Sequence, residues 1–101
     1  MTLRAALCLL LATVLTGCVT TGKQDPLKTE KGRDEARDAY IQLGIGYLQM
    51  GNTEQAKVPL RQALDIDSSS ADAHAALAVV YQVEKEPKLA ESEFRLSLIH
   101  I

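Results

Sequence analysis

Apolar residues recur at helical spacing from residue 40 onward, whereas the start of the chain holds one unbroken apolar run. The first periodic stripe stands at positions i, i+3, i+4 and i+7 and consists of Tyr40, Leu43, Gly44 and Tyr47. A second stripe follows with Ala56, Leu60 and Ala63. Between them lies Gly51-Asn52-Thr53, which is typical of a turn that ends one helix and caps the next. The pattern therefore predicts two helices joined by a tight turn.

The helical pair occurs twice at a fixed period. Residues from 37 onward align with residues from 71 onward, so that Leu43 matches Leu77 and Tyr47 matches Tyr81. The other matched pairs are Gly44 with Ala78, Ala56 with Ala90, Leu60 with Phe94, and Ala63 with Ser97. A fixed period of about 34 residues indicates stacked helical hairpins.

Single residues predict the details of these helices. Pro59 lies inside the second helix, where it removes one backbone hydrogen bond and predicts a mild bend. In the second copy Ser69 suits the N-cap position and Asp72 the third helical position, as in a capping box. Pro87 fits the first position of the last helix.

The repeat resembles the tetratricopeptide (TPR) signature, which implies an all-α fold of helix–turn–helix repeats. Twelve positions would form the packing between these helices: Tyr40, Leu43, Gly44, Tyr47, Ala56, Leu60, Ala63, Leu77, Ala78, Tyr81, Ala90 and Phe94. The second copy stops at its thirty-first residue, and a stack of this kind needs roughly three copies for stability. We therefore expect a truncated α-solenoid, either the N-terminal part of a longer protein or a truncated product, that is marginally stable or prone to self-association.

The apolar run at the start of the chain covers residues 5–15, in which only Thr13 is polar. A membrane-spanning helix needs roughly 18 apolar residues, so the run is too short to span. A positive start at Arg4, a short apolar run and small residues at its end are typical of a secretory signal peptide. In the simplest interpretation this is an ordinary signal peptide and Cys18 follows it by chance.

The end of the run favours a lipoprotein signal instead. Leu15-Thr16-Gly17-Cys18 resembles a bacterial lipobox. This resemblance implies that the Cys18 thiol receives a diacylglyceryl group, that a peptidase cuts before it, and that the new amino terminus is acylated. Several acyl chains together make a long-lived membrane anchor. Because Val19 stands where Asp favours inner-membrane retention in such lipoproteins, the resemblance implies the outer membrane, with the chain facing the periplasm.

These features divide the chain into four parts. Residues 1–17 are the signal peptide, residues 18–33 a flexible tether, residues 34–68 the first TPR repeat and residues 69–101 the second, incomplete repeat. The fifteen residues of Val19–Arg33 have linker composition. Such a coil averages about 20 Å end to end and stretches to about 50 Å, so the repeats would stay close to the membrane.

Composition and charge argue against several kinds of site. The formal net charge is −2 with no basic cluster, so nucleic acid is not an expected partner. The two cysteines, Cys8 and Cys18, make neither a disulfide framework nor a zinc site. Gly44-Ile45-Gly46 lacks the third glycine of a dinucleotide-binding motif. The two histidines, His74 and His100, have no evident partner acid. We expect no enzyme, no metal, no small-molecule substrate and no cofactor apart from the acyl groups on Cys18.

The first helix carries a second apolar stripe beside the packing face: Ile41, Ile45 and Leu48. It lies about 100° round the helix, on the flank that lines the partner-binding groove in TPR proteins. Ala75 and Val79 hold the matching positions in the second copy. Two interpretations stand side by side: the stripe packs on the neighbouring helix, or it forms an apolar groove that binds a peptide or helix.

The lipobox followed by DEARDAYIQLGIGYLQMGNTEQAKVPLRQALDIDSSSADAHAALAVVYQ resembles the pilotin lipoproteins of type IV pilus biogenesis, the PilF/PilW family. The resemblance implies a protein that escorts secretin subunits to the outer membrane and promotes their multimerisation, with the groove in its first repeat. Two alternatives remain: a TPR adaptor lipoprotein for outer-membrane barrel assembly or cell-wall enzymes, and an enzyme whose active site lies beyond Ile101.

Overall fold

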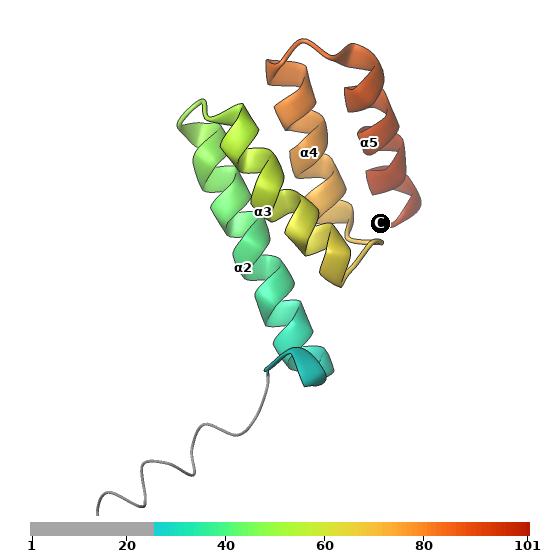
Figure 1. The fold of residues 1–101 in the computed structure, drawn as a ribbon. Coiled ribbons are helices and arrows are strands. Elements are labelled where there is room, and N and C mark those ends of the chain that lie inside the picture. The colour runs from blue at the N-terminus through green and yellow to red at the C-terminus, as the bar shows by residue number, and fades with distance from the viewer. Residues whose placement is uncertain (1–25) are drawn as a thin grey trace, which may run out of the picture.

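Two helical hairpins make up the part of the chain that the computed structural model describes, residues 26–101 (Figure 1). A short 3-10 helix, η2 (Pro26–Lys28), precedes four α-helices, α2 (Glu30–Gln49), α3 (Thr53–Ile66), α4 (Ala71–Val83) and α5 (Pro87–Ile99). The signal peptide, Cys18 and residues 19–25 of the tether lie outside the described residues. None of the described helices is long and apolar enough to cross a membrane.

The hairpins stack side by side. Helix α2 packs on α3 and α4 packs on α5, while α3 joins the hairpins by packing on α4 (Figure 1). Helix α2 also contacts α4 directly. The repeat period of 34 residues appears in the helix boundaries. Helix α2 ends at Gln49 and α4 ends 34 residues later at Val83. Helix α3 starts at Thr53 and α5 starts 34 residues later at Pro87. The predicted all-α TPR fold is confirmed, as is Pro87 as the first residue of its helix.

The first α-helix begins earlier than the sequence pattern predicted. Thr29 caps α2 by accepting a hydrogen bond from the Gly32 backbone N–H at 2.9 Å. Helix α2 therefore starts at Glu30, inside the segment predicted as tether. Thr29 lies in a stretch with linker composition, so composition alone did not predict that a helix starts there.

The cap of α4 also differs from the prediction. Ser70, not Ser69, is the N-cap, and its side chain accepts from the Ala73 backbone N–H at 3.3 Å. Ser69 instead donates to Asp67 Oδ1 from its backbone N–H at 3.1 Å and from its hydroxyl at 2.8 Å. Asp67 thus holds Ser69 in a turn before the helix, and the predicted capping box with Asp72 does not form.

Both hairpin turns have the same geometry. Gly51 (φ 79°) and Lys85 (φ 60°) are left-handed and hold equivalent positions in the two repeats. In the first turn the Asn52 N–H donates to the Tyr47 carbonyl at 2.9 Å, and in the second the Glu86 N–H donates to the Tyr81 carbonyl at 2.8 Å. These bonds define a Schellman motif. The turn prediction at Gly51 is confirmed, and Lys85 adopts the same backbone without the advantage of glycine.

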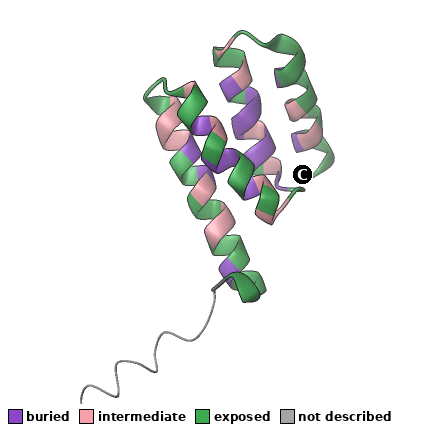
Figure 2. Cartoon of the chain, in the orientation of Figure 1, coloured by how far each residue is buried: buried purple, intermediate pink, exposed green. Residues whose placement is uncertain are grey.

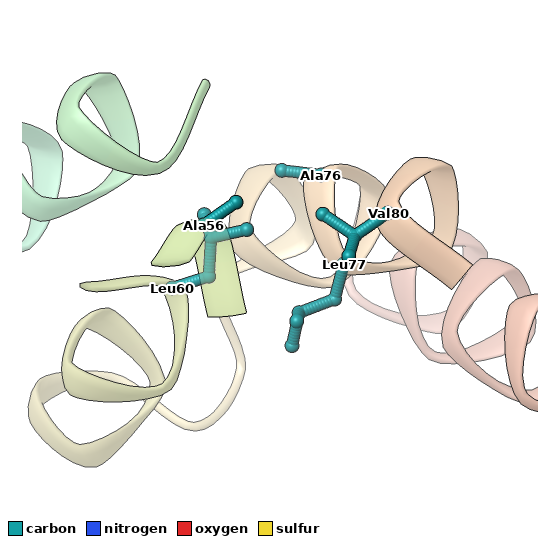
Figure 3. Packing of buried hydrophobic residues seen from close by; sticks show 5 residues of the cluster. All are labelled: Ala56, Leu60, Ala76, Leu77 and Val80. Carbon is teal, nitrogen blue, oxygen red and sulfur yellow. The ribbon is translucent and has the colours of Figure 1, made fainter. Parts of the chain in front are cut away.

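The core lies where α3 meets α2 and α4 (Figure 2). Its larger cluster consists of Ala56, Leu60, Ala76, Leu77 and Val80, drawn in Figure 3. Leu60 and Val80 are fully buried. A smaller cluster joins Ile41, Ala63 and Ala73. Helix α3 continues through Pro59, which is itself buried.

Most of the predicted packing residues are buried or half-buried, and Leu43 is the exception. Its side chain is 49% exposed, whereas its repeat equivalent Leu77 is 2% exposed. Leu77 packs in the cluster that α3 and α4 form. No α-helix precedes α2 in the described part of the chain, so no equivalent helix covers Leu43. Leu43 therefore stays a predicted packing residue, and no described helix covers it.

Candidate functional site

An apolar groove of about 380 Å³ lies between α2 and α4. Its lining consists of Ile41, Gln42, Ile45, Leu48, Asp72, Ala75, Ala76 and Val79. All five residues that the sequence placed in a partner-binding groove, Ile41, Ile45, Leu48, Ala75 and Val79, are brought together here. We call this feature the α2–α4 groove.

Helical spacing explains why these side chains converge. Ile41, Ile45 and Leu48 follow one another at four and three residues, so they share one face of α2. On α4, Ala75 and Val79 stand four residues apart in the same way. Because α2 contacts α4 directly, the two faces meet and form the two walls of the groove.

The groove residues divide into a floor and a rim. Ile41 is 5% exposed and packs with Ala63 and Ala73, so it belongs to the core as well as to the groove floor. Ile45 is half-buried and packs against both core clusters. Val79 is 38% exposed and offers the most accessible apolar surface in the groove. The stripe therefore packs between helices at Ile41 and lines an open groove towards Val79, and binding of a peptide or helix there stays a prediction.

Asp72 is the only charged residue that lines the α2–α4 groove. It is exposed and stands in the first turn of α4. Gln42 is the only other polar residue of the lining. The groove is thus apolar with one acidic end.

A larger hollow of about 610 Å³ lies against α4 and α5 and includes Ala90, Phe94 and Leu98. Phe94 is the repeat equivalent of Leu60, which is fully buried in the cluster between α3 and α4. This hollow therefore lies on the face that packs against a neighbouring helix in the first repeat. Four charged residues also line it: Lys85, Glu86, Glu91 and Arg95. The α2–α4 groove is the better candidate for partner binding, because its apolar lining carries one charge.

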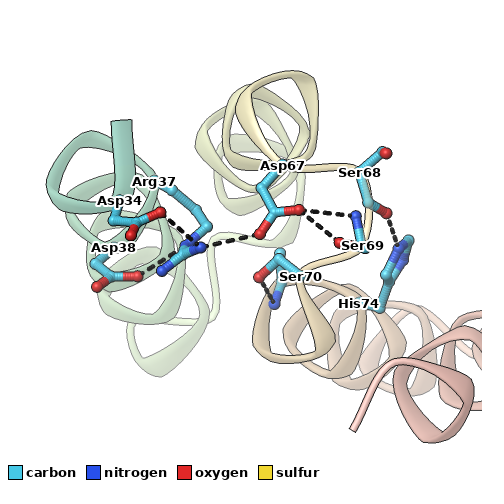
Figure 4. A network of polar contacts seen from close by, with 9 residues as sticks. Asp34, Arg37, Asp38, Asp67, Ser68, Ser69, Ser70 and His74 are labelled. Atoms are coloured by element: carbon cyan, nitrogen blue, oxygen red, sulfur yellow. Dashed lines mark hydrogen bonds and ion pairs between the residues drawn. The ribbon is translucent and has the colours of Figure 1, made fainter. Parts of the chain in front are cut away.

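Arg37 ties the two helices of the first hairpin together. Its Nη1 donates to Asp67 Oδ2 at 2.9 Å, which links α2 to the residue that ends α3 (Figure 4). Its Nε donates to Asp38 Oδ1 at 3.0 Å. Both carboxylates raise the pKa of the Arg37 guanidinium, and the hydrogen bond to Asp38 has the larger effect. Hydrogen bonds from Ser69 and Arg37 lower the pKa of Asp67.

Lys57 ties the two hairpins together. Its ammonium lies 2.9 Å from Glu54 Oε1 on its own helix and 3.0 Å from Glu84 Oε1 at the end of α4. Both carboxylates raise the pKa of Lys57. The same ammonium lies 6.0 Å from the centre of the Tyr81 ring. Lys57 and Arg37 therefore fix the relative positions of the helices that carry the groove.

His74 has a partner acid that the sequence did not reveal. Its Nδ1 lies 2.7 Å from Glu93 Oε2, and its Nε2 lies 2.8 Å from the Ser68 carbonyl oxygen. His74 is 7% exposed, and its ring stacks on the His100 ring with the ring centres 6.1 Å apart. Both ring nitrogens are thus engaged in joining α4 to α5 and to the preceding turn, which is a structural arrangement. Among the described residues no group of His, Cys, Asp and Glu could hold a metal ion.

Comparison with known proteins finds a relative at high sequence identity. No protein-family model matches the chain. Over 98 residues, 97% of this chain, the sequence is 78% identical to the type IV pilus assembly protein of Pseudomonas aeruginosa, PilF. The chain is similar to PilF. A solved structure from the functional characterization of P. aeruginosa PilF matches 69% of this chain with a TM-score of 0.69 and 78% sequence identity.

The similarity covers only part of PilF. The chain spans 39% of the length of the curated PilF sequence and 32% of the chain in the solved structure. Both helical hairpins, and with them the α2–α4 groove, lie within a chain that matches PilF almost from end to end.

Proposed function

We propose that this chain acts in type IV pilus assembly as a pilotin, a lipid-anchored protein whose α2–α4 groove binds secretin subunits. By binding them it promotes their localisation to the outer membrane and their assembly into multimers. The 78% identity to PilF supports the pilus system. The observation that carries the binding role is the groove itself, which gathers five apolar side chains from two repeats around one open space.

The geometry favours binding over chemistry. Apolar grooves between helices recognise segments of other proteins by burying their apolar side chains. The groove lining contains no Ser, Thr, Cys, His, Lys or Tyr side chain, and its single carboxylate, Asp72, is exposed. We therefore propose a non-catalytic protein with a protein partner, and with no role for nucleic acid or a small-molecule substrate.

The membrane anchor is a separate part of the proposal. Cys18 follows Leu15-Thr16-Gly17 at the end of the apolar run, and lipidation of its thiol and of the new amino terminus would hold the repeats at the membrane. Val19 supports the outer membrane, facing the periplasm. Binding and anchoring would then combine, because a short tether places the groove where secretin subunits must gather.

The matched variants Val79→Asp and Val58→Asp test the groove. Val79 lines the groove, whereas Val58 is 58% exposed on α3 outside the groove lining. Both side chains reach solvent, so neither change should unfold the chain, which circular dichroism can check. In cells that depend on this protein, Val79→Asp should lower the amount of detergent-resistant secretin multimer in the outer membrane, and Val58→Asp should not.

The same experiment separates the alternatives. Normal secretin multimers with Val79→Asp would contradict the pilotin proposal. If barrel proteins or cell-wall enzymes were mislocalised instead, the chain would be an adaptor for those systems.

A further inference from the structure

The charge of the α2–α4 groove follows from a difference between the two repeats. Asp38 and Asp72 hold equivalent positions in the two repeats. Asp38 is paired with its neighbour Arg37 at 3.0 Å. In the second repeat Ala71 stands where Arg37 stands in the first, so Asp72 has no neighbouring guanidinium. The first repeat neutralises this acid and the second does not.

Asp72 keeps its charge available at the groove. It takes part in none of the ion pairs or side-chain hydrogen bonds found between described residues. A carboxylate in the first turn of a helix is also stabilised by the helix dipole. That interaction is with the backbone of α4 and leaves an exposed side chain free to meet a cation. No Lys or Arg lines the groove.

The dimensions of the groove favour a helical occupant. Ile41 to Leu48 on α2 and Asp72 to Val79 on α4 each cover eight residues, a rise of about 10 Å or two helical turns. An extended strand would leave its backbone N–H and C=O groups without partners against the walls, since α2 and α4 use their own backbone groups internally. A helix satisfies its backbone itself and presents apolar side chains at i, i+4 and i+7 over the same length.

From these observations we infer that the α2–α4 groove takes an amphipathic helix of the partner that carries about two turns of apolar side chains and a Lys or Arg beside Asp72. This inference rests on the proposed function, since it describes the secretin segment that would bind. The cation fixes the direction of the helix in the groove, because Asp72 lies at one end and Val79 two turns further along α4.

Two synthetic helical peptides test the inference without the secretin. Both carry leucines at i, i+4 and i+7, and they differ by a single Lys or Glu placed one turn beyond the leucines. The full chain should bind the Lys peptide about fivefold more tightly at low salt, a ratio typical of partly exposed charge pairs. The ratio should shrink in about 0.5 M salt, because screening acts within a few ångströms there.

Matched variants then assign the effect to one carboxylate. Asp72→Asn should bring the two peptides to nearly equal affinity, whereas Asp65→Asn, which removes an exposed acid of α3 outside the groove, should keep the fivefold ratio. Val79→Asp should abolish binding of both peptides. Failure of the Lys peptide to bind, equal affinities for the unaltered chain, or an unchanged ratio in Asp72→Asn would overturn the inference. The pilotin proposal is tested by secretin multimers in cells and this inference by peptide binding to the full chain. Loss of the Lys preference with normal dependence of secretin assembly on Val79 would therefore contradict the inference alone.

Discussion

Gly44 is a position where α2 closely approaches Leu60 of α3, and a single methyl group tests that approach. A Cβ atom on Gly44 would lie 2.5 Å from Leu60 Cγ and 2.7 Å from Leu60 Cδ2, whereas carbon atoms in contact are normally about 3.5–4.0 Å apart. Leu60 is fully buried, so it can give way only by displacing its neighbours in the core. Two residues along the same helix, a Cβ atom on Gly46 would meet nothing within 4 Å.

The comparison of Gly44→Ala with Gly46→Ala isolates this steric cost. Both glycines lie inside α2, so each change to alanine stabilises the helix by about 0.8–1 kcal/mol. This stabilisation is the same in both variants and cancels when they are compared. Overpacking a filled core costs about 1–3 kcal/mol. Gly46→Ala should therefore raise the free energy of unfolding by up to about 1 kcal/mol, and Gly44→Ala should lie about 1–3 kcal/mol below Gly46→Ala.

Urea unfolding followed by far-ultraviolet circular dichroism measures the difference. An equivalent thermal measurement should separate the two variants by about 4–8 °C for each kcal/mol. A Gly44→Ala variant that has lost its cooperative transition would also fit the steric argument. Equal stability of the two alanine variants would refute it, because the close packing of α2 against Leu60 would then not exist in solution.

Three further predictions follow from the turns, the polar contacts and the signal. Gly51 and Lys85 both have a left-handed backbone. Lys85→Gly should therefore raise the free energy of unfolding by about 0.5–1 kcal/mol, and Gly51→Ala should lower it by about 1 kcal/mol. Thermal melting checks both variants, and a destabilised Lys85→Gly would contradict the turn geometry. Ser69 and Arg37 lower the pKa of Asp67, so this carboxylate stabilises the fold above its unfolded pKa of about 3.9 and loses that contribution as the pH falls through its folded pKa. Asp67→Asn should therefore flatten the loss of stability measured by urea unfolding between about pH 5 and pH 2, and an unaltered slope would speak against the contact. Cys18→Ser should leave the protein without acyl mass and outside the outer-membrane fraction, as mass spectrometry and fractionation can show, and an acylated variant in that fraction would rule out the lipobox.

Repetition made much of the fold predictable from sequence. Matching Leu43 with Leu77 and Tyr47 with Tyr81 placed both hairpins, and the helix ends follow the same repeat period. The groove was predictable for the same reason, because the spacing of Ile41, Ile45 and Leu48 fixes their common face. What that face binds remains a prediction.

Other features depend on contacts that no local pattern contains. Leu43 and Leu77 are equivalent in sequence, yet only Leu77 is covered by a described helix. Three consecutive serines could each cap α4, and the choice depends on Asp67, which engages Ser69. The Glu93 partner of His74 lies nineteen residues away and comes close only when α5 folds back on α4.

Site-specific crosslinking in cells tests the central claim most directly. A photoactivatable residue at Val79 would sit in the α2–α4 groove, and the same residue at Val58 would sit on α3 outside it. The account predicts a covalent adduct with the pilus secretin from position 79 and none from position 58. Adducts with a barrel-assembly or cell-wall protein from position 79, or equal secretin adducts from both positions, would contradict it.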